Sequence, residues 1–466
     1  MIVTTNHNQT TISKKVSLNG VGLHTGKDVS ITFQPSESNT GYCFKRIDLD
    51  NQPIVEANIN YVTNTERGTC LNKNNVIIQT CEHVLASLVG LEIDNVLIEL
   101  DASEPPIMDG SSKYFIEALE NAGIKELKEK RKEFVVKNVI SYKDKESGSE
   151  ITVIPADEYQ VTTMVDFGTK ILGTQNASIS SISEFKDNIS SCRTFSFLHE
   201  IEMLLNEGLI KGGDLNNAIV YVDKKISNDT MEKLKKAFNK DKVSVKSNGI
   251  LDNLTLHYRN EAARHKLLDV LGDLALIGKR IRGKVIAKKP GHYINTEFAK
   301  KISDLIEKEE NLELEKKKYE KEAIMDAEQI MNILPHRPPF LFIDKILKIS
   351  ENSITGLKYV SPDEPYFKGH FPGRPVMPGV LQIEAMAQVG GVLVLSTFPD
   401  PENYLTFFGR IENAKFKRPV EPGDTLIFEL ELLSPIRRGI SHMFARAYVD
   451  GELTTEAEMK AKIIKK

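Results

Sequence analysis

Apolar and polar residues alternate in some segments of the chain and follow a helical spacing in others. Residues 29–33 read VSITF, and this alternation with a period of two predicts a β-strand. Residues 379–395 form a nearly uninterrupted apolar stretch that predicts a long buried helix, and alternating segments follow it at 425–432 and 440–449. One buried helix followed by antiparallel strands is typical of an α+β domain.

Two upstream segments share one order of elements. Residues 82–100 (EHVLASLVGLEIDNVLIEL) and residues 264–289 (RHKLLDVLGDLALIGKRIRGKVIAKK) each read as a helix, a glycine, a turn and a strand. Each segment also has a histidine in its first helical turn. The identity between them is too low to establish a duplication, but it indicates two similar α/β halves.

A charged run divides the chain. Twelve of the sixteen residues from Glu307 to Glu322 are charged, so this segment has no face to bury, whereas Glu and Lys three and four positions apart support a solvated helix. A new amphipathic segment opens after Asp326, a residue type that commonly caps helices. We therefore expect a first domain over residues 1–305, a charged helical linker over 306–325 and a second domain over 326–466.

Composition is that of a globular protein and excludes several classes. At 466 residues the chain is too long for one compact core, and its net charge of −4 offers no general footprint for nucleic acid. The four cysteines stand far apart and form no CxxC pair, which is typical of a reducing compartment. The N-terminus lacks the apolar core of a signal peptide and no stretch of about 18 apolar residues occurs, so we expect a cytoplasmic protein without a membrane span.

Candidate metal ligands come from both halves. His265, Asp269 and Asp273 recur every four residues on one face of the helix at 264–275, and an imidazole and a carboxylate so spaced can bind one cation. Taken alone, this pattern indicates a helix cap or a salt bridge more often than a metal. The pair Glu82–His83, at the matching place of the other half, supplies a third ligand and a general base for a hydrolytic zinc site.

These two segments, with GVGLHTG (20–26), PIMDGS (106–111), RTF (193–195) and GHYIN (291–295), resemble the UDP-3-O-acyl-N-acetylglucosamine deacetylase family. The motifs follow the family's order from residue 11 to about residue 305. The resemblance implies removal of an N-acetyl group in lipid A synthesis, with UDP-3-O-acyl-N-acetylglucosamine as substrate, and a fold of two α/β layers with helices between sheets. It also implies Zn²⁺ as cofactor, bound by His83, His265 and Asp269.

The same resemblance implies roles for residues around the ligands. Glu82 is the expected general base, His292 the expected acid or oxyanion partner, and Thr194 a donor to the oxyanion. Lys266 and Asp273 match supporting residues, the former near the substrate and the latter oriented towards His292.

An acyl-chain passage is a further implication of the resemblance. The stretch 197–213 is similar to an inserted element that forms this passage in the family, although any single apolar residue there is also explained by packing. The expected substrate contacts are Phe195, Ile201, Ile210 and Gly213.

A second candidate site lies in the apolar helix at 379–395. The preceding segment HFPGRPVMPG (370–379) is dense in proline and glycine, which predicts a rigid turn. Glu384 is the one acid in the helix, and it is either a paired structural carboxylate or a protonated general acid; the sequence alone favours neither. With His370 as base and the Gly379 amide polarising a thioester carbonyl, such an acid would expel a β-hydroxyl group as water.

The second domain resembles the (3R)-hydroxyacyl-acyl-carrier-protein dehydratase family. Three segments carry the resemblance in the family's order: LPHRPPFLFIDKI (334–346), EPYFKGHFPGRPVMPGVLQIEAMAQ (364–388) and FFGRIENAKFKRPVEPGD (407–424). His370 and Glu384 have the family's spacing of fourteen residues. The resemblance implies a hot-dog fold, a sheet wrapped round the helix, and a homo-oligomer that dimerises through sheet edges, with His370 of one subunit facing Glu384 of the other.

Acyl carrier protein is the implied partner of this domain. A set of basic residues is its candidate docking surface, and a merely solubilising role is the alternative reading. This set is Lys415, Lys417, Arg418, Arg437 and Arg438.

Three functions remain open for the whole chain. Both sites are active, or one half is only a binding or oligomerising module, or the second domain hydrolyses thioesters. Neither half lacks a catalytic residue of its family, and the pair His370–Glu384 favours dehydration over hydrolysis. We therefore expect a bifunctional enzyme that acts on (3R)-hydroxyacyl groups carried by a sugar nucleotide and by the carrier protein.

Overall fold

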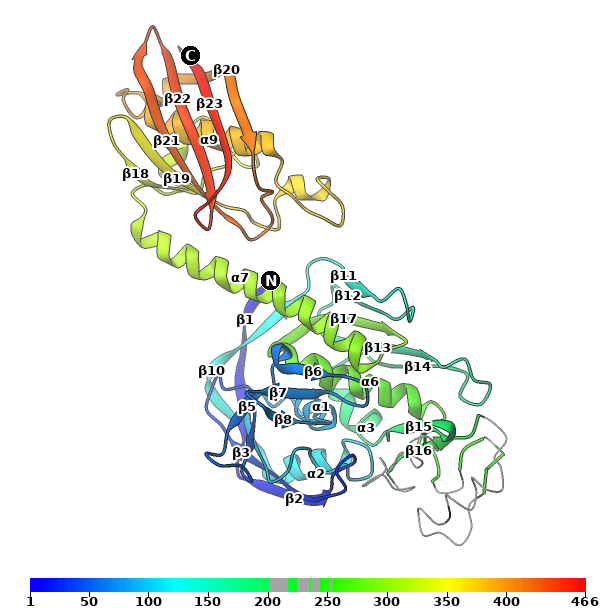
Figure 1. The fold of residues 1–466 in the computed structure, drawn as a ribbon. Helices are drawn as coiled ribbons and strands as arrows, with labels where there is room; N and C mark the ends of the chain where they lie inside the picture. Colours follow the sequence, from blue (N-terminus) through cyan, green and yellow to red (C-terminus); the bar gives the residue numbers. More distant parts are fainter. Residues whose placement is uncertain (202–216, 224–234, 236–243, 248, 252–253) are drawn as a thin grey trace. The chain divides into compact units, whose positions relative to one another are not determined.

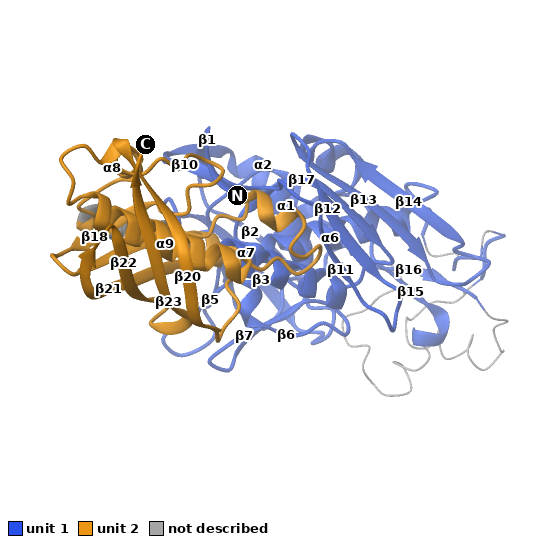
Figure 2. Cartoon of the chain, turned by 90° about the horizontal axis from the view of Figure 1, so that it is seen from above, with its two compact units in different colours: residues 1–306 blue, residues 307–466 orange. Residues whose placement is uncertain are grey.

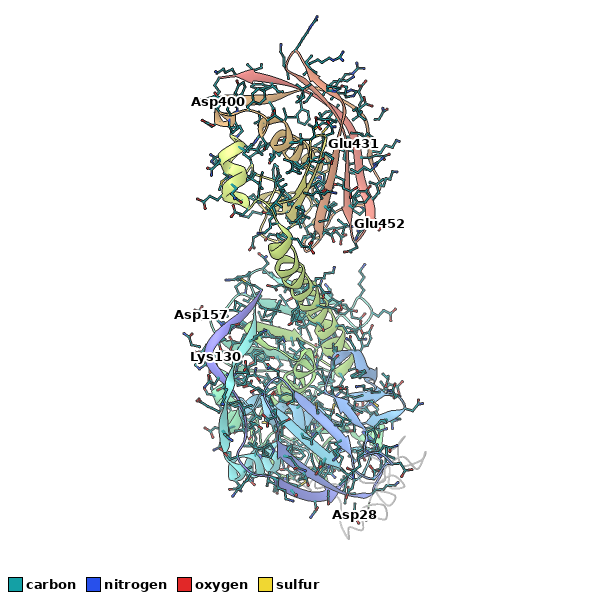
Figure 3. All side chains as sticks on the ribbon, turned by 90° about the vertical axis from the view of Figure 1, so that its left-hand side faces the viewer. Asp28, Lys130, Asp157, Asp400, Glu431 and Glu452 are labelled. Carbon is teal, nitrogen blue, oxygen red and sulfur yellow. The ribbon has the colours of Figure 1, made fainter. Side chains whose placement is uncertain are left out.

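The structure is a computed structural model, and it describes residues 1–201, 217–223, 235, 244–247, 249–251 and 254–466. The chain divides into two compact units, Met1–Ile306 (unit 1) and Glu307–Lys466 (unit 2), shown in different colours in Figure 2. Each unit has its own cluster of buried apolar residues. Charged side chains labelled in Figure 3 include Lys130 in unit 1 and Glu452 in unit 2, which are both exposed.

Unit 1 contains a large mixed sheet built round β17, which pairs in parallel with β10 and β13 and antiparallel with β12 (Figure 1). Alternate residues of β17, including Ile281, Val285 and Ala287, are buried. The seven strands of this sheet are β1 (Ile2–Ile12), β10 (Ile124–Val135), β17 (Arg280–Lys288), β12 (Glu150–Ile154), β11 (Ile140–Lys143), β13 (Tyr159–Asp166) and β14 (Thr174–Ile179).

A five-stranded sheet forms the other half of unit 1. The alternation at 29–33 is confirmed as part of β3, with Val29, Ile31 and Phe33 buried. The strands are, in spatial order, β2 (Val16–Val21), β3 (Asp28–Pro35), β9 (Val96–Leu100), β4 (Tyr42–Arg46) and β5 (Ile54–Glu56). Two small sheets complete the unit: β6 (Val62–Asn64), β7 (Cys70–Lys73) and β8 (Val76–Ile78), and the pair β15 (Phe195–Phe197) and β16 (Ile219–Tyr221).

Helices α1 (Glu82–Gly90) and α6 (Glu261–Leu274) pack against each other, and α6 also packs on β13 and β14. A Cβ atom at Gly272 would lie 2.1 Å from the Glu82 carbonyl oxygen, so this glycine permits the close approach of the two helices. The remaining helical elements are α2 (Lys113–Ala122), α3 (Phe185–Asn188) and the 3₁₀ turns η1 (Ile59–Tyr61), η2 (Ile182–Glu184) and η3 (Ala275–Ile277).

The two similar halves predicted from the sequence are confirmed by this arrangement. Helix α1 is followed by β9, and α6 is followed by β17. Each of these strands has both parallel and antiparallel neighbours in its sheet: β9 pairs in parallel with β4 and antiparallel with β3, and β17 pairs in parallel with β10 and β13 and antiparallel with β12. The two histidines are not at equivalent helix positions: His83 is the second residue of α1, as expected, whereas α6 begins at Glu261, so His265 is its fifth residue and lies beyond the first turn expected from the sequence.

Helix α7 (His292–Glu322) is longer than the charged run alone predicts, because it begins at His292. Its first turns belong to the core of unit 1 through five buried apolar side chains. These are Ile294, Phe298, Ala299, Ile302 and Ile306. Residues of the charged run therefore continue a helix that is anchored in unit 1.

Unit 2 has the hot-dog architecture expected from the sequence: a six-stranded antiparallel sheet covers α9 (Gly379–Leu395). The helix bounds match the apolar stretch, and the close contact of Gly356 with Val389 shows how tightly sheet and helix pack. The strands are, in spatial order, β18 (Lys345–Ile349), β19 (Ser353–Tyr359), β21 (Thr425–Arg437), β22 (Ile440–Val449), β23 (Glu452–Lys465) and β20 (Tyr404–Phe416).

A capped helix opens the folded part of unit 2. Asp326 accepts a hydrogen bond from the Gln329 amide and completes a capping box at the start of α8 (Ala327–Ile333), as the sequence predicts. Two 3₁₀ turns, η4 (Pro365–Lys368) and η5 (Pro401–Asn403), lie on either side of α9 in the sequence. Within the described part of the chain, no helix combines the length and apolar character that a membrane crossing needs.

Candidate active sites

A buried cluster in unit 1 brings together three of the predicted ligands. His265 Nε2 lies 3.4 Å and His83 Nε2 lies 3.8 Å from Asp269 Oδ1, and all three side chains are buried. Ligand atoms at about 2.1 Å from a tetrahedral ion are separated by about 3.4 Å, so the observed spacing suits one small cation. Among the described residues this is the group of His, Cys, Asp and Glu side chains that could hold a metal.

One carboxylate oxygen of Asp269 has no hydrogen-bond partner among the described residues, which supports a bound cation at this position. Its Oδ2 pairs with Lys266 Nζ at 2.8 Å, whereas its buried Oδ1 has no hydrogen-bond partner. A buried carboxylate oxygen without a partner is costly unless a cation neutralises it. Two imidazoles and one carboxylate are the donor set of catalytic zinc sites, with a fourth position left for water or substrate. The residues present therefore fit a zinc ion.

Hydrogen bonds behind the cluster fix its geometry. His265 Nδ1 lies 3.0 Å from the Cys192 carbonyl oxygen, which orients the ring and leaves Nε2 for the candidate metal. The next residue, Arg193, forms a buried ion pair with Glu261 in the first turn of α6, with Nε and Oε1 2.9 Å apart. The segment that precedes Thr194 is thus attached directly to the helix that carries two of the ligands.

Glu82 and His292 face each other beside the ligand cluster. His292 Nε2 lies 3.9 Å from Glu82 Oε1 and 4.0 Å from Asp269 Oδ2. On its other side, His292 Nδ1 contacts Asp273 Oδ2 at 2.9 Å. Asp273 is held in turn by Thr69 Oγ1 and by Asn295 Nδ2, the latter at 2.8 Å. An acid, an imidazole and a second acid therefore form a continuous row next to the candidate metal position.

Burial and mutual charge separate the pKa values of these groups. Burial raises the pKa of Glu82 to about 7, although the nearby His292 acts in the opposite direction. For His292, burial alone would lower the pKa, but the carboxylates of Asp273 and Glu82 raise it to about 9. Burial, with the adjacent His265, lowers the pKa of His83 to about 3. At neutral pH, His83 is therefore neutral, as a metal ligand must be, and His292 is protonated.

The structure describes two of the four substrate contacts predicted for unit 1, Phe195 and Ile201. The Phe195 ring lies 6.4 Å from the His265 ring and 5.6 Å from Lys266 Nζ, so it borders the ligand cluster. Thr194 precedes it and donates its amide to the Gly110 carbonyl at 2.8 Å. Ile201 is buried. Ile210 and Gly213 lie outside the described residues.

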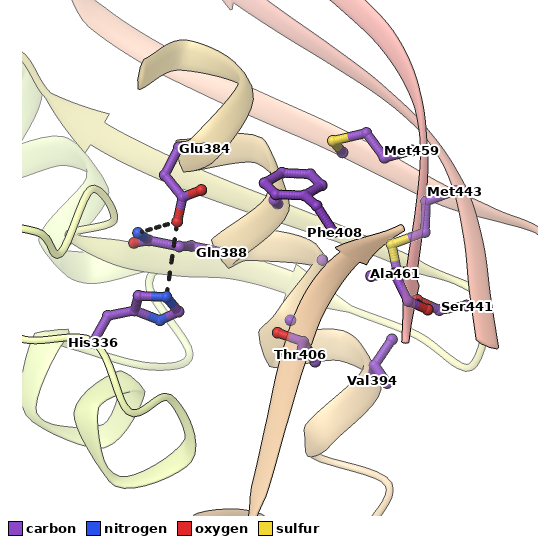
Figure 4. Close-up of a pocket in the computed structure, with 13 residues that line it drawn as sticks. His336, Glu384, Gln388, Val394, Thr406, Phe408, Ser441, Met443, Met459 and Ala461 are labelled. Atoms are coloured by element: carbon purple, nitrogen blue, oxygen red, sulfur yellow. Dashed lines mark hydrogen bonds and ion pairs between the residues drawn. The ribbon is translucent and has the colours of Figure 1, made fainter. Parts of the chain in front are cut away.

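Unit 2 has a pocket of about 60 Å³ with Glu384 at one end (Figure 4). Glu384 Oε1 accepts a hydrogen bond from Gln388 Nε2 at 2.9 Å, and His336 Nε2 lies 3.7 Å from the same oxygen. The rest of the lining is mostly apolar and includes Val394, Phe408, Met443 and Met459. This combination of one acid with an apolar wall suits an acyl chain that carries one reactive polar group.

His370 does not line this pocket. Its Nδ1 lies 2.8 Å from the Val376 carbonyl oxygen and its ring stacks on Phe371. Gly379, the first residue of α9, packs under the ring of Phe416, because a Cβ there would lie 2.6 Å from that ring. Within the described residues of one chain, no contact joins His370 to Glu384.

Comparisons with known proteins agree with both units. A family model described as UDP-3-O-acyl N-acetylglycosamine deacetylase (LpxC) matches residues 9–243 and 230–304, and a FabA-like domain matches residues 334–458. The "Bifunctional enzyme LpxC/FabZ" of Porphyromonas gingivalis is 46% identical over 98% of both chains. The protein of the same description from Bacteroides thetaiotaomicron is 45% identical over 98% of this chain and 99% of its own.

The chain belongs to the bifunctional LpxC/FabZ family. As a member of this family it joins a deacetylase unit to a dehydratase unit, with unit 1 in the LpxC position and unit 2 in the FabZ position. A single-function relative, the UDP-3-O-acyl-N-acetylglucosamine deacetylase of Geobacter sp. (strain M21), matches unit 1 alone: 35% identity over 62% of this chain and 86% of the relative.

Four residues of the LpxC/FabZ sites escaped the sequence reasoning. In unit 1, Thr69 and Asn295 both hydrogen-bond Asp273, and Thr69 also donates its amide to Glu82 at 3.1 Å. In unit 2, His336 and Gln388 both contact Glu384. His336 stands in a segment that carries the family resemblance, LPHRPPFLFIDKI, where a histidine among prolines was a usable signal. Thr69 had none, because its role arises from a hydrogen bond to Asp273, which is 204 positions away in the sequence.

The basic residues of unit 2 do not form one patch on a single chain. Lys415 pairs with Glu456 at 3.1 Å, Lys417 with Glu456 at 3.5 Å, and Arg418 with Glu452 at 3.6 Å. Arg437 lies at the other end of the sheet. Lys415 is opposite Glu456 of β23. Arg437 is opposite Ile440, and Ile440 is opposite Lys462 of β23. Six strand positions separate Glu456 from Lys462, or roughly 20 Å. The two groups would therefore have to dock a partner separately.

Proposed function

We propose that unit 1 hydrolyses the N-acetyl group of UDP-3-O-acyl-N-acetylglucosamine with zinc as cofactor. The orphaned Asp269 Oδ1, facing two buried imidazoles, is the observation that carries the zinc assignment. His83, His265 and Asp269 would hold the ion, which when bound supplies Lewis acidity for amide hydrolysis. The iron ion is the alternative occupant, and metal analysis of the purified protein distinguishes the two.

The roles of the other side chains follow from their positions. Glu82 accepts the proton of the attacking water, and His292, across from it, donates a proton to the departing amine. Thr194 donates a hydrogen bond to the developing oxyanion. Lys266 orients Asp269 and Asp273 holds His292, so both are positioning residues by their contacts in unit 1. Substrate contacts are proposed for Phe195, Ile201, Ile210 and Gly213.

The substitution Glu82→Gln tests the division between ligand and base. Because Glu82 is not one of the three ligands, the variant should keep its metal content and its fold. It should lose between about 10² and 10⁴ in kcat for deacetylation, the usual contribution of a general base. A loss of metal in this variant would instead make Glu82 a ligand. Dehydration by the same preparation serves as the internal control.

Unit 2 is proposed to dehydrate (3R)-hydroxyacyl-acyl carrier protein to the trans-2-enoyl product. His370 removes the proton next to the thioester carbonyl, and Glu384 donates a proton to the β-hydroxyl, which leaves as water while the double bond forms. The Gly379 amide, in the first turn of α9, polarises the carbonyl. The acid set in an apolar pocket supports this reading. Thioester hydrolysis would instead release free acid and carrier thiol, and product analysis separates the two reactions.

A homodimer is proposed to complete the second site. Strand β20 is the last strand of the sheet, and apolar side chains on both of its faces are exposed. These are Phe407, Phe408, Ile411 and Phe416. Pairing of this edge with that of a second copy would cover them and supply the His370 that Glu384 lacks in its own chain.

The cytoplasm is the proposed location, in keeping with four cysteines that are all free. The experiment that tests the function as a whole measures metal content, deacetylation and dehydration on one purified preparation. Both products are expected at one metal ion per chain. Failure of either reaction while the other proceeds would leave a single-function enzyme.

A further inference from the structure

Two nitrogen atoms of one chain face the same oxygen of Glu384. Gln388 Nε2 donates to Oε1 at 2.9 Å, and His336 Nε2 stands 3.7 Å from it (Figure 4). The other oxygen, Oε2, accepts no hydrogen bond from any residue that the structure describes. The two oxygens of this acid are therefore in different environments, and a general acid uses only one of them to carry its proton.

The orientation of Gln388 is fixed by the loop that precedes β18. Its side chain is buried, its Oε1 accepts the Phe342 amide at 2.8 Å, and its Nε2 also donates to the Phe340 carbonyl at 3.0 Å. If the amide were flipped, its N–H groups would face the Phe342 N–H, and its oxygen would face the Phe340 carbonyl oxygen and Glu384 Oε1. Gln388 therefore donates an N–H to Glu384 Oε1. The lone pair of Oε1 that accepts this hydrogen bond cannot also carry a proton.

His336 is held in place on the same loop. Arg337 Nη1 donates to the carbonyls of Leu334 and His336 at 2.8 and 2.7 Å, and the imidazole stacks at 26° on the Phe340 ring. Its Nδ1 is buried and has no hydrogen-bond partner. Burial lowers the pKa of His336, so that the ring is neutral and carries one N–H. An N–H on Nδ1 would be an orphaned buried donor, which is rarer than an orphaned acceptor, so the N–H belongs on Nε2.

We propose that His336 and Gln388 form a two-donor clamp on Oε1 of Glu384, so that the proton donated in dehydration is carried on Oε2. A carboxyl oxygen has two lone pairs, and two N–H donors occupy both. The present 3.7 Å is longer than a hydrogen bond, and a small rotation of either side chain closes it when substrate excludes water. Both residues act through Glu384 and are positioning residues. The proposal rests on the dehydratase function proposed for unit 2.

Substitutions at His336 test the clamp. H336F keeps a ring against Phe340 but removes the donor, and H336Q restores an N–H. Without the second donor, H336F should lose about 10- to 100-fold in kcat, the range of one hydrogen bond to a charged group, with KM within about threefold of the unmodified protein. H336Q should recover kcat to within about fivefold. The matched control is H442Q, since His442 pairs with Glu458 on the sheet of the same unit but outside the pocket.

A double-mutant cycle separates the clamp from a structural role. In an E384Q background, H336F should cause no further loss in kcat, because the group that it positions is already gone. The proposed clamp is contradicted if H336F leaves kcat unchanged or if H336Q is as impaired as H336F. It is also contradicted if the losses in kcat caused by H336F and E384Q multiply in the double mutant. No dehydration by the unmodified full chain would instead overturn the proposed function, a result that the His336 variants alone cannot produce.

Discussion

Units 1 and 2 assemble their reactive side chains in different ways. In unit 1, α1 and α6 pack side by side, and both ends of the acid–base row and all three candidate ligands come from one chain. In unit 2, the same chain supplies Glu384 with two neighbours, His336 and Gln388, but not with His370. The candidate metal ligands and the acid–base row of unit 1 are thus brought together within one chain, whereas the proposed dehydratase site needs a His370 that its own chain does not bring to Glu384.

This difference follows from how each unit buries its polar groups. The carboxylates of the unit 1 site are at most 3% exposed, and they form one network of acids and bases with His292 and Lys266, which are 14% and 18% exposed, so removal of one member leaves the others uncompensated. The Glu384 side chain is 19% exposed at the end of its pocket, and in the proposed homodimer the second subunit would contribute its His370 there. Loss of one residue should therefore act within one chain in unit 1 and between chains in unit 2.

The largest effect is expected for His265→Ala. This variant removes one of three ligands, so the metal content should fall to background and deacetylation should drop by on the order of 10³-fold or more. Dehydration should be unchanged. The measurements are metal analysis and both assays, with His7→Ala, an exposed histidine of the same unit, as the matched control. Full metal occupancy in His265→Ala would remove this residue from the ligand set.

A smaller effect is expected for Asp273→Asn, which keeps the shape but not the charge. His292 donates its proton while protonated, and the Asp273 carboxylate is the main group that raises its pKa to about 9 against the effect of burial. Without that charge the pKa of His292 falls, so the alkaline limb of the kcat profile should move to lower pH by about one unit. This shift alone lowers the protonated fraction of His292 at pH 8 by about twofold, and the weaker hydrogen bond to the His292 ring should lower kcat by about 10- to 100-fold across the profile.

The control for this profile is Asp304→Asn, an exposed acid on the same helix α7. It should leave the alkaline limb in place. An unshifted limb in Asp273→Asn as well would mean that His292 is not the group that titrates there, and its assignment as the acid would fail.

Much of the fold was predictable because periodicity decides which faces are buried. The strand at 29–33, the helix at 379–395 and the cap at Asp326 were each predicted from local patterns and are confirmed. The start of α7 was missed, because its first turns follow a Pro-Gly pair and mix polar with apolar residues, whereas only the later charged run has a conspicuous helical pattern. The pairing of β17 with both β10 and β13 is non-local and had no local signal.

The site in unit 1 was more accessible to sequence reasoning than that in unit 2. His265 and Asp269 are one helical turn apart, so their proximity follows from helix geometry alone. His336 and Glu384 are 48 positions apart, and their contact depends on how the loop before β18 packs on α9. An acid on an apolar helix identified Glu384 as unusual, but not which residues it would meet.

Mixed dimers test whether the dehydratase site is shared between two subunits, and the expected change in activity is smaller. Proteins carrying His370→Ala or Glu384→Ala should each be inactive in dehydration when alone. If each site takes His370 from one subunit and Glu384 from the other, a mixed dimer has one site with both lesions and one with neither. Equal mixing makes about half of the dimers mixed, so about a quarter of the unmodified activity should return. Deacetylation should not change at any mixing ratio.

Subunit exchange must be shown independently, for example by co-purification through two different tags. Demonstrated exchange without returning activity would place His370 and Glu384 of a working site in the same chain, and the second site would then resemble the first.

The smallest effect is expected when the two units are separated. A fragment of residues 1–311 keeps every apolar side chain by which α7 joins the core of unit 1, the last being Ile306. A fragment of residues 323–466 keeps Ile324 and Met325, whose amides both donate to the Ile346 carbonyl, at 2.9 and 3.3 Å. Because neither cut removes a core contact, each fragment should keep its own kcat within about twofold of the full chain.

The matched control is a fragment that ends at Lys301 and so loses Ile302 and Ile306, which are 0% and 5% exposed. Removal of two buried isoleucines should destabilise unit 1 by several kcal/mol, on the order of 4. Its Tm should then lie roughly 10 °C below that of residues 1–311. Thermal unfolding and both activity assays measure these differences. Loss of activity in the longer fragments, with the full chain active, would mean that each site depends on the other unit, and the contrast between a self-contained site and a shared one would no longer hold.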